Sequence, residues 1–135
     1  MFATIKYNTN NIFMRKILLL FALFTTGIIA SKEKPKYMWF DCEANYQRLS
    51  SSDSILFYLN KVKSVGFTDV VVDVKSIMGE VLYKSNIAPF MGEWEGRYRN
   101  ADFDMMKSFI DQGHKLGLKV HASLNVFAGG HNFFN

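Results

Sequence analysis

The amino-acid sequence predicts an α/β fold that is built on a parallel β-sheet. Two observations lead to this prediction. Short runs rich in β-branched and aromatic residues alternate with amphipathic stretches, and a glycine ends each amphipathic stretch just before the next run. The resulting order of strand, helix, strand, loop, helix and strand is typical of parallel strands joined by right-handed crossovers.

The first elements have clear signals. Residues 37–42, YMWFDC, are short and aromatic and predict a strand. Residues 50–67 predict a helix, because apolar residues recur at helical spacing, Asp53 or a neighbouring serine can cap the start, and Gly66 is a natural stop. Residues 67–75, FTDVVVDVK, predict a second strand that is buried.

A long loop separates these elements from the last two. Residues 76–101 contain glycines and a proline without a sustained period, which predicts a loop. Residues 102–117 predict a second amphipathic helix that ends at Gly117, and residues 118–127, LKVHASLNVF, predict the third strand. Loops of this length are usually functional or disordered.

Side chains alternate between the two faces of a strand, so each predicted strand divides into two sets. In the second strand Val70, Val72 and Val74 form an apolar set, which we expect the helices to cover. Asp73 and Lys75 belong to the opposite, mixed set. The first strand divides into an apolar set, Met38, Phe40 and Cys42, and a mixed set, Tyr37, Trp39 and Asp41. The third strand divides into an apolar set, Val120, Ala122, Leu124 and Val126, and a mixed set, His121, Ser123 and Asn125.

Three parallel strands with helices on one face leave the other face and both edges uncovered. All-parallel sheets are normally covered on both faces, and open edges invite aggregation. Closing the sheet into a barrel solves both problems. The sequence therefore predicts the N-terminal part, about three β/α units, of a (β/α)8 TIM barrel. A complete barrel needs about 250 residues, so we expect a truncated one.

The N-terminal residues predict export. Arg15 and Lys16 precede an apolar run and a small residue, Ala30, as in a secretory signal peptide whose true start would be Met14. Such a protein is secreted or periplasmic and has no stable membrane insertion after cleavage; an uncleaved signal anchor is the alternative. The predicted segments are a leader over 1–30, a solvated linker over 31–36 and a folded domain over 37–135.

Composition excludes several functions. Removing Lys6, Arg15 and Lys16 with the leader reduces the 16 basic residues to 13 against 12 acidic ones, so a near-neutral domain remains and nucleic-acid binding is not expected. The one cysteine, Cys42, excludes an internal disulfide. No glycine-rich phosphate loop follows the first strand, and we expect no cofactor.

Three stretches resemble a known family. MWFDCEANYQRLSSSDSI, GFTDVVVDVKSIMGEVLYKSNIAP and GHKLGLKVHASLNVFAGGHNFF are similar to the exported glycosyl hydrolase-like family 10 domains, and the resemblance covers residues 37–134. It implies a (β/α)8 barrel of a carbohydrate-active hydrolase, with residues 37–135 as a partial domain. In such barrels the catalytic carboxylates usually lie on later strands. We therefore expect them beyond Asn135, and expect this fragment alone to be inactive.

Four polar residues are candidates for contact with a carbohydrate substrate. Asp73, Lys75, Asn125 and Asp41 lie toward the carboxyl ends of the strands, where ligands bind in parallel α/β folds. An internal ion pair between Asp73 and Lys75 is the structural alternative. Asp41 and Glu43 are candidates for a carboxylate pair, but near neighbours at a strand end point in different directions, so we do not expect them to straddle one bond.

Three further candidates lie in loops. Trp94 and Tyr83 belong to the loop 76–101, and aromatic faces suit the apolar faces of sugar rings, although packing onto the domain explains Tyr83 equally well. His131 follows the third strand and can reach the same edge. His121 is expected to be a core histidine, and no ligand spacing supports a metal site.

Two alternatives to a hydrolase remain. One is a non-catalytic carbohydrate-binding protein of the same fold. The other is a small α/β module that covers its open face by dimerisation. The expected partners are therefore a carbohydrate and either the missing barrel half or a second copy.

Overall fold

The computed structural model describes residues 14–17 and 34–130. The chain divides between Lys34 and Pro35, and the second unit, Pro35–Asn135, holds the sheet and the helices described below. Residues 14–17 are helical. The rest of the predicted leader and residues 31–33 of the linker lie outside the described residues. Within the described ranges, no helix combines the length and the apolar character needed to span a bilayer.

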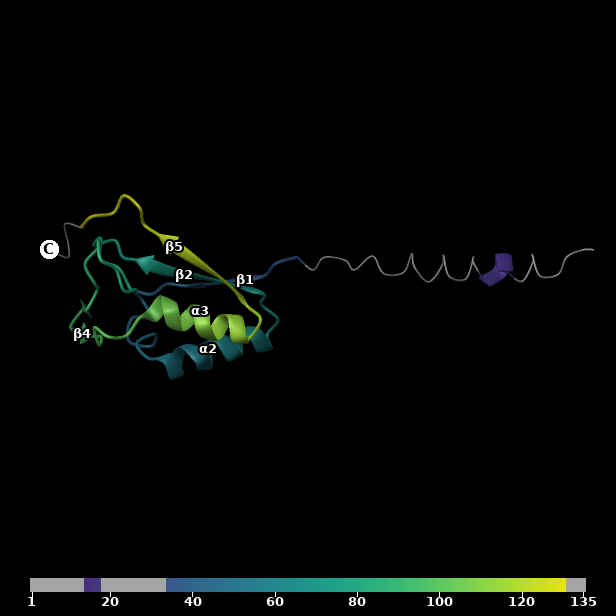
Figure 1. Cartoon of the computed structure of the whole chain (residues 1–135). Helices are drawn as coiled ribbons and strands as arrows, with labels where there is room; N and C mark the ends of the chain where they lie inside the picture. The colour runs from purple at the N-terminus through teal and green to yellow at the C-terminus, as the bar shows by residue number, and fades with distance from the viewer. Residues whose placement is uncertain (1–13, 18–33, 131–135) are drawn as a thin grey trace, which may run out of the picture. The chain divides into compact units, whose positions relative to one another are not determined.

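The described residues of the second unit, 35–130, form five strands and two helices. They are, in chain order, β1 (Tyr37–Phe40), α2 (Ser52–Ser64), β2 (Asp69–Lys75), β3 (Glu93–Trp94), β4 (Arg97–Tyr98), α3 (Met105–Lys115) and β5 (Lys119–Leu124). β1, β2 and β5 form a parallel sheet in the order β1-β2-β5, and β3 pairs with β4 in an antiparallel hairpin. Figure 1 shows α2 and α3 side by side on one face of the parallel sheet.

The prediction of a TIM-barrel portion is wrong. The unit is a small α/β fold in which a three-stranded parallel sheet is accompanied by a separate antiparallel hairpin, and this is not the pattern of repeated β/α units. The hairpin lies inside the segment 76–101, which was predicted to be a loop. Strands of two residues are too short to produce an alternating pattern, so periodicity does not predict them.

The helices begin and end where their capping residues require. Ser51 Oγ accepts a hydrogen bond from the Ser54 amide at 3.3 Å and caps α2, and Asp104 does the same for the Lys107 amide at 2.8 Å at the start of α3. Gly66, which follows α2, has a φ of 86°, a backbone conformation that strongly favours glycine. The stop predicted from this glycine is therefore confirmed.

The core lies between the helices and the sheet. The prediction that helices cover one face of β2 is confirmed, because Val70, Val72 and Val74 are fully buried. The same prediction is wrong for the end of β5, where Ala122 and Leu124 are exposed. The reason is that α3 covers only the first part of this edge strand. The remaining buried apolar side chains include Phe40, Tyr46, Leu49, Ile55, Leu59, Leu82, Met91, Met105 and Phe109.

In the described part of the second unit, no helix lies against the other face of the parallel sheet. Tyr37 and Trp39 of β1 are more than half exposed on this face. His121, which was expected to be a core residue, is also on it, and its Nε2 lies 2.8 Å from Asp69 Oδ1 with 44% of the side chain exposed. Self-association that would cover this face stays a prediction.

Substitution of Gly113 tests how tightly α3 packs on β5. A β-carbon at Gly113 would lie 2.6 Å from Val120 Cγ2. Gly113→Ala should therefore lower the free energy of unfolding by about 1–3 kcal/mol in a urea titration, because a stiff β-branched side chain must move. Gly129→Ala, where a β-carbon meets nothing within 4 Å, is the control. The double variant Gly113→Ala/Val120→Ala should lose less stability than the two single losses added together; full additivity would contradict this packing.

Candidate functional site

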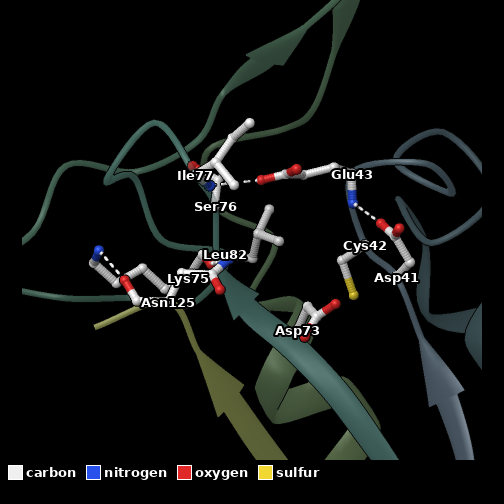
Figure 2. A pocket seen from close by; sticks show the side chains of 9 residues that line it. All are labelled: Asp41, Cys42, Glu43, Asp73, Lys75, Ser76, Ile77, Leu82 and Asn125. Atoms are coloured by element: carbon white, nitrogen blue, oxygen red, sulfur yellow. Dashed lines mark hydrogen bonds between the residues drawn. The ribbon is translucent and has the colours of Figure 1, made fainter. Parts of the chain in front are cut away.

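A cavity of about 210 Å3 lies at the carboxyl ends of the three parallel strands. We call it the strand-end cavity. Its lining comes from the turn after β1, from the end of β2 and the following loop, and from the residue after β5. Figure 2 shows the nine lining residues, Asp41, Cys42, Glu43, Asp73, Lys75, Ser76, Ile77, Leu82 and Asn125. The four polar candidates predicted at the strand ends are therefore brought together in one place.

Asp41 and Glu43 are both fixed by backbone amides. Asp41 Oδ1 accepts hydrogen bonds from the amides of Glu43 at 3.1 Å and Ala44 at 2.9 Å, which closes the turn after β1. Glu43 Oε1 accepts the Ile77 amide at 2.8 Å and so joins this turn to the loop after β2 (Figure 2). The two carboxyls line the same cavity although they are close neighbours in the sequence, because the chain turns between them.

The third carboxyl comes from the centre of the sheet. Asp73 Oδ2 accepts the indole N–H of Trp39 at 2.9 Å, so an exposed aromatic side chain of β1 orients an acid of β2.

Burial raises the pKa of Glu43 above its ordinary value, and the negative charges of Asp41 and Asp73 raise it further, while the Ile77 hydrogen bond opposes them. A neutral carboxyl is therefore favoured at Glu43 more than at an ordinary glutamate.

Lys75 and Asn125 join two loops rather than forming an ion pair with Asp73. The Lys75 ammonium donates to the carbonyl of Asn125 at 2.7 Å and to the carbonyl of Ala128. Asn125 Nδ2 donates to the Lys75 carbonyl at 3.2 Å (Figure 2). No ion pair between Asp73 and Lys75 occurs in the described part of the chain. Lys75 therefore holds the segment after β5 in place at the cavity rim.

Cys42 lines the cavity but is not a nucleophile. The side chain is fully buried, and its Sγ donates to the Phe40 carbonyl at 3.4 Å. Burial, followed by the nearby charge of Asp73, raises the pKa of the thiol far above its ordinary value. The thiolate, which is the reactive form, is therefore suppressed.

The loop candidates do not join this cavity. Trp94 lines a different cavity, together with Glu93 and Glu95 of the hairpin. Tyr83 is partly buried and packs against the hydrophobic core, as the structural alternative for this residue proposed. His131 lies outside the described residues. Sequence reasoning gave too little weight to Glu43, because the turn that brings it to the cavity is formed by side-chain capping rather than by any periodic pattern.

Most of the chain is similar to a short part of an S-layer-related protein. No family model matches the chain, so the resemblance to glycosyl hydrolase-like family 10 domains stays a prediction. The chain is similar to an S-layer-related protein from Niallia circulans, with 33% identity over 113 residues. The match covers 79% of this chain but 7% of that relative, so the activity of the whole relative does not transfer to this chain.

The raised pKa of Glu43 predicts a pH-dependent stability. The folded state keeps a proton that the unfolded state loses above about pH 4.5, so the free energy of unfolding should fall as pH rises through this range. Glu43→Gln keeps an acceptor for the Ile77 amide and removes the ionisation. The stability of the variant relative to wild type should therefore increase between pH 4 and pH 7 in urea titrations. If the difference in free energy of unfolding between the variant and wild type stays constant from pH 4 to pH 7, the prediction is wrong.

Proposed function

We propose that this chain is a secreted or cell-surface protein whose strand-end cavity binds carbohydrate. The predicted leader supports export, and the name of the S-layer-related relative agrees with a surface location. More specific localisation, in the periplasm or outside the cell, is part of the same proposal.

The observation that carries the proposal is the way in which the three carboxyls are held. Asp41, Glu43 and Asp73 each use one oxygen to accept hydrogen bonds from a protein donor. Within the described residues, the second oxygen of each has no protein donor. The cavity therefore presents fixed acceptors that need donors, and sugar hydroxyl groups supply donors in such an arrangement.

The size and chemistry of the cavity fit a sugar better than an apolar ligand. Its volume of about 210 Å3 is below the ~300–1,000 Å3 of pockets for drug-sized molecules, which favours a single sugar ring or a chain end. The raised pKa of Glu43 makes its protonated form, which can donate a hydrogen bond, more accessible than at an ordinary glutamate. The fixed acceptors of the cavity suit the hydroxyls of a sugar, which donate hydrogen bonds.

Glycoside hydrolysis is the second candidate. Glycosidases place a carboxyl with a raised pKa near a second carboxylate, and Glu43 shares this cavity with Asp73. Each of these groups already holds the structure together through one oxygen, so binding is the more direct proposal. A catalytic pair beyond Asn135, which the family resemblance implies, also stays a prediction.

The full chain should bind sugars in a manner that depends on Asp73. A glycan array identifies the sugar, and titration calorimetry then measures its affinity. Asp73→Asn keeps an acceptor for Trp39 and should weaken binding about tenfold, because a charged acceptor in a hydrogen bond contributes roughly 1.5–3 kcal/mol and a neutral one less.

The matched control is Asp102→Asn, which makes the same change at an exposed acid that does not line this cavity. It should bind like the wild type. No binding to any glycan, or equal affinity of the Asp73→Asn variant and wild type, would show that the proposal is wrong. Release of new reducing ends from the bound glycan would instead favour the hydrolase.

A further inference from the structure

A second cavity, of about 450 Å3, lies beside the β3–β4 hairpin. We call it the hairpin cavity. Its lining residues are Met78, Glu80, Pro89, Glu93, Trp94 and Glu95. It shares no residue with the strand-end cavity, and its volume is about twice as large. The proposal made for the strand-end cavity therefore says nothing about the ligand of the hairpin cavity.

One part of the hairpin cavity is apolar and fixed. Trp94 is partly buried and packs against the hydrophobic core, so its ring is held in position while it lines the cavity. Met78 and Pro89 add further apolar surface. A cavity that combines a fixed aromatic ring with a few polar groups is the usual form of a small-molecule site.

The polar part of the same cavity is entirely acidic. Among the described residues, Glu80, Glu93 and Glu95 are the only charged ones that line it, and Arg97, which pairs with Trp94 across the hairpin, does not. Glu93 Oε1 is held by the Gly96 amide at 2.5 Å. Burial raises the pKa of Glu80, and the charge of Glu93 raises it further. A positive charge in the cavity would relieve this repulsion.

We propose that the hairpin cavity binds an organic cation, namely an ammonium group attached to a ring or chain with an apolar face. The ammonium group lies among the glutamates, and the apolar face lies on the Trp94 ring, where cation–π attraction adds to the binding. A hard metal ion fits less well. Calcium takes six to eight oxygen ligands, whereas Trp94, Met78 and Pro89 line a large part of this cavity with apolar groups.

Titration of the full chain, followed by NMR of the indole N–H signals, tests the proposal directly. The probes are glucosamine, N-acetylglucosamine, glucose and Nα-acetyl-lysine methylamide. The two amines should shift the Trp94 signal in a saturable way, and the two neutral sugars should not. Shifts with glucosamine alone identify a cationic sugar as the source of the ammonium group, whereas shifts with the lysine derivative alone identify an alkylammonium chain. Trp39, the other tryptophan of the chain, donates its indole N–H to Asp73 of the strand-end cavity, so its signal reports binding there and separates the two cavities in the same titration.

Variants separate this cavity from the rest of the molecule. Glu80→Gln/Glu93→Gln/Glu95→Gln should weaken amine binding about tenfold or more, because three charge contacts are lost together. Glu95→Gln alone, at an exposed turn position, should weaken it about twofold to fivefold and covers the case in which the triple variant does not fold. Asp102→Asn is the charge-matched control outside the cavity and should bind amines like the wild type.

Three outcomes would overturn the proposal. The first is the absence of any Trp94 shift at amine concentrations of tens of millimolar. The second is equal binding of glucosamine and glucose, which would show that charge is not recognised. The third is wild-type amine affinity in a triple variant that keeps its native circular dichroism. None of these outcomes concerns Asp73, so failure here and failure of the carbohydrate proposal are distinguishable.

Discussion

The loops of this fold depend on the contacts made by the buried guanidinium of Arg99. The residue is 6% exposed, and its guanidinium lies 4.0 Å from the centre of the Tyr46 ring. It donates to the Tyr46 carbonyl at 2.8 Å and to Ser50 Oγ at 3.2 Å, while the Tyr46 hydroxyl donates to the Met91 carbonyl at 2.9 Å. These contacts join the segment after β1 to the segment that carries the hairpin, so both cavities rest on loops that one side chain connects.

The choice of arginine follows from its chemistry. No carboxylate pairs with Arg99 in the described part of the chain, and burial lowers the pKa of its guanidinium. Lysine in the same position would lose its proton far more readily, and it lacks the planar group that stacks on Tyr46 while donating in several directions. Burying the charge of Arg99 costs free energy of desolvation. This cost is offset because the guanidinium donates hydrogen bonds to a carbonyl and a hydroxyl and stacks on an aromatic ring.

The sequence predicts the periodic parts of this fold and misses the parts that single contacts determine. β1, β2, β5 and both helices follow from spacing, and Val70, Val72 and Val74 lie on the covered face because alternation in a buried strand allows nothing else. The gathering of Asp41, Asp73 and Asn125 follows from the rule that parallel strands end at one edge. The burial of Arg99 has no such signal, because it depends on Tyr46, which is 53 residues away. The barrel prediction failed for a related reason: a β-α-β order is shared by several α/β folds, and the order alone does not determine how a sheet ends.

The strand-end cavity has carboxyl groups that are held in place and also have an oxygen left to accept a hydrogen bond from a ligand. These two properties have the same origin. Two of its carboxyls reach across to a different segment, Asp73 to Trp39 and Glu43 to Ile77, and Asp41 accepts from the amides of the turn that it begins. Because one oxygen is bound in each case, the direction of the other is set before any ligand arrives, and little entropy is lost on binding. Burial raises the pKa of Glu43, and the charges of the two neighbouring acids raise it further. The arrangement is therefore stabilised by a ligand that brings hydrogen-bond donors, whereas an apolar ligand would leave the acids desolvated and without partners.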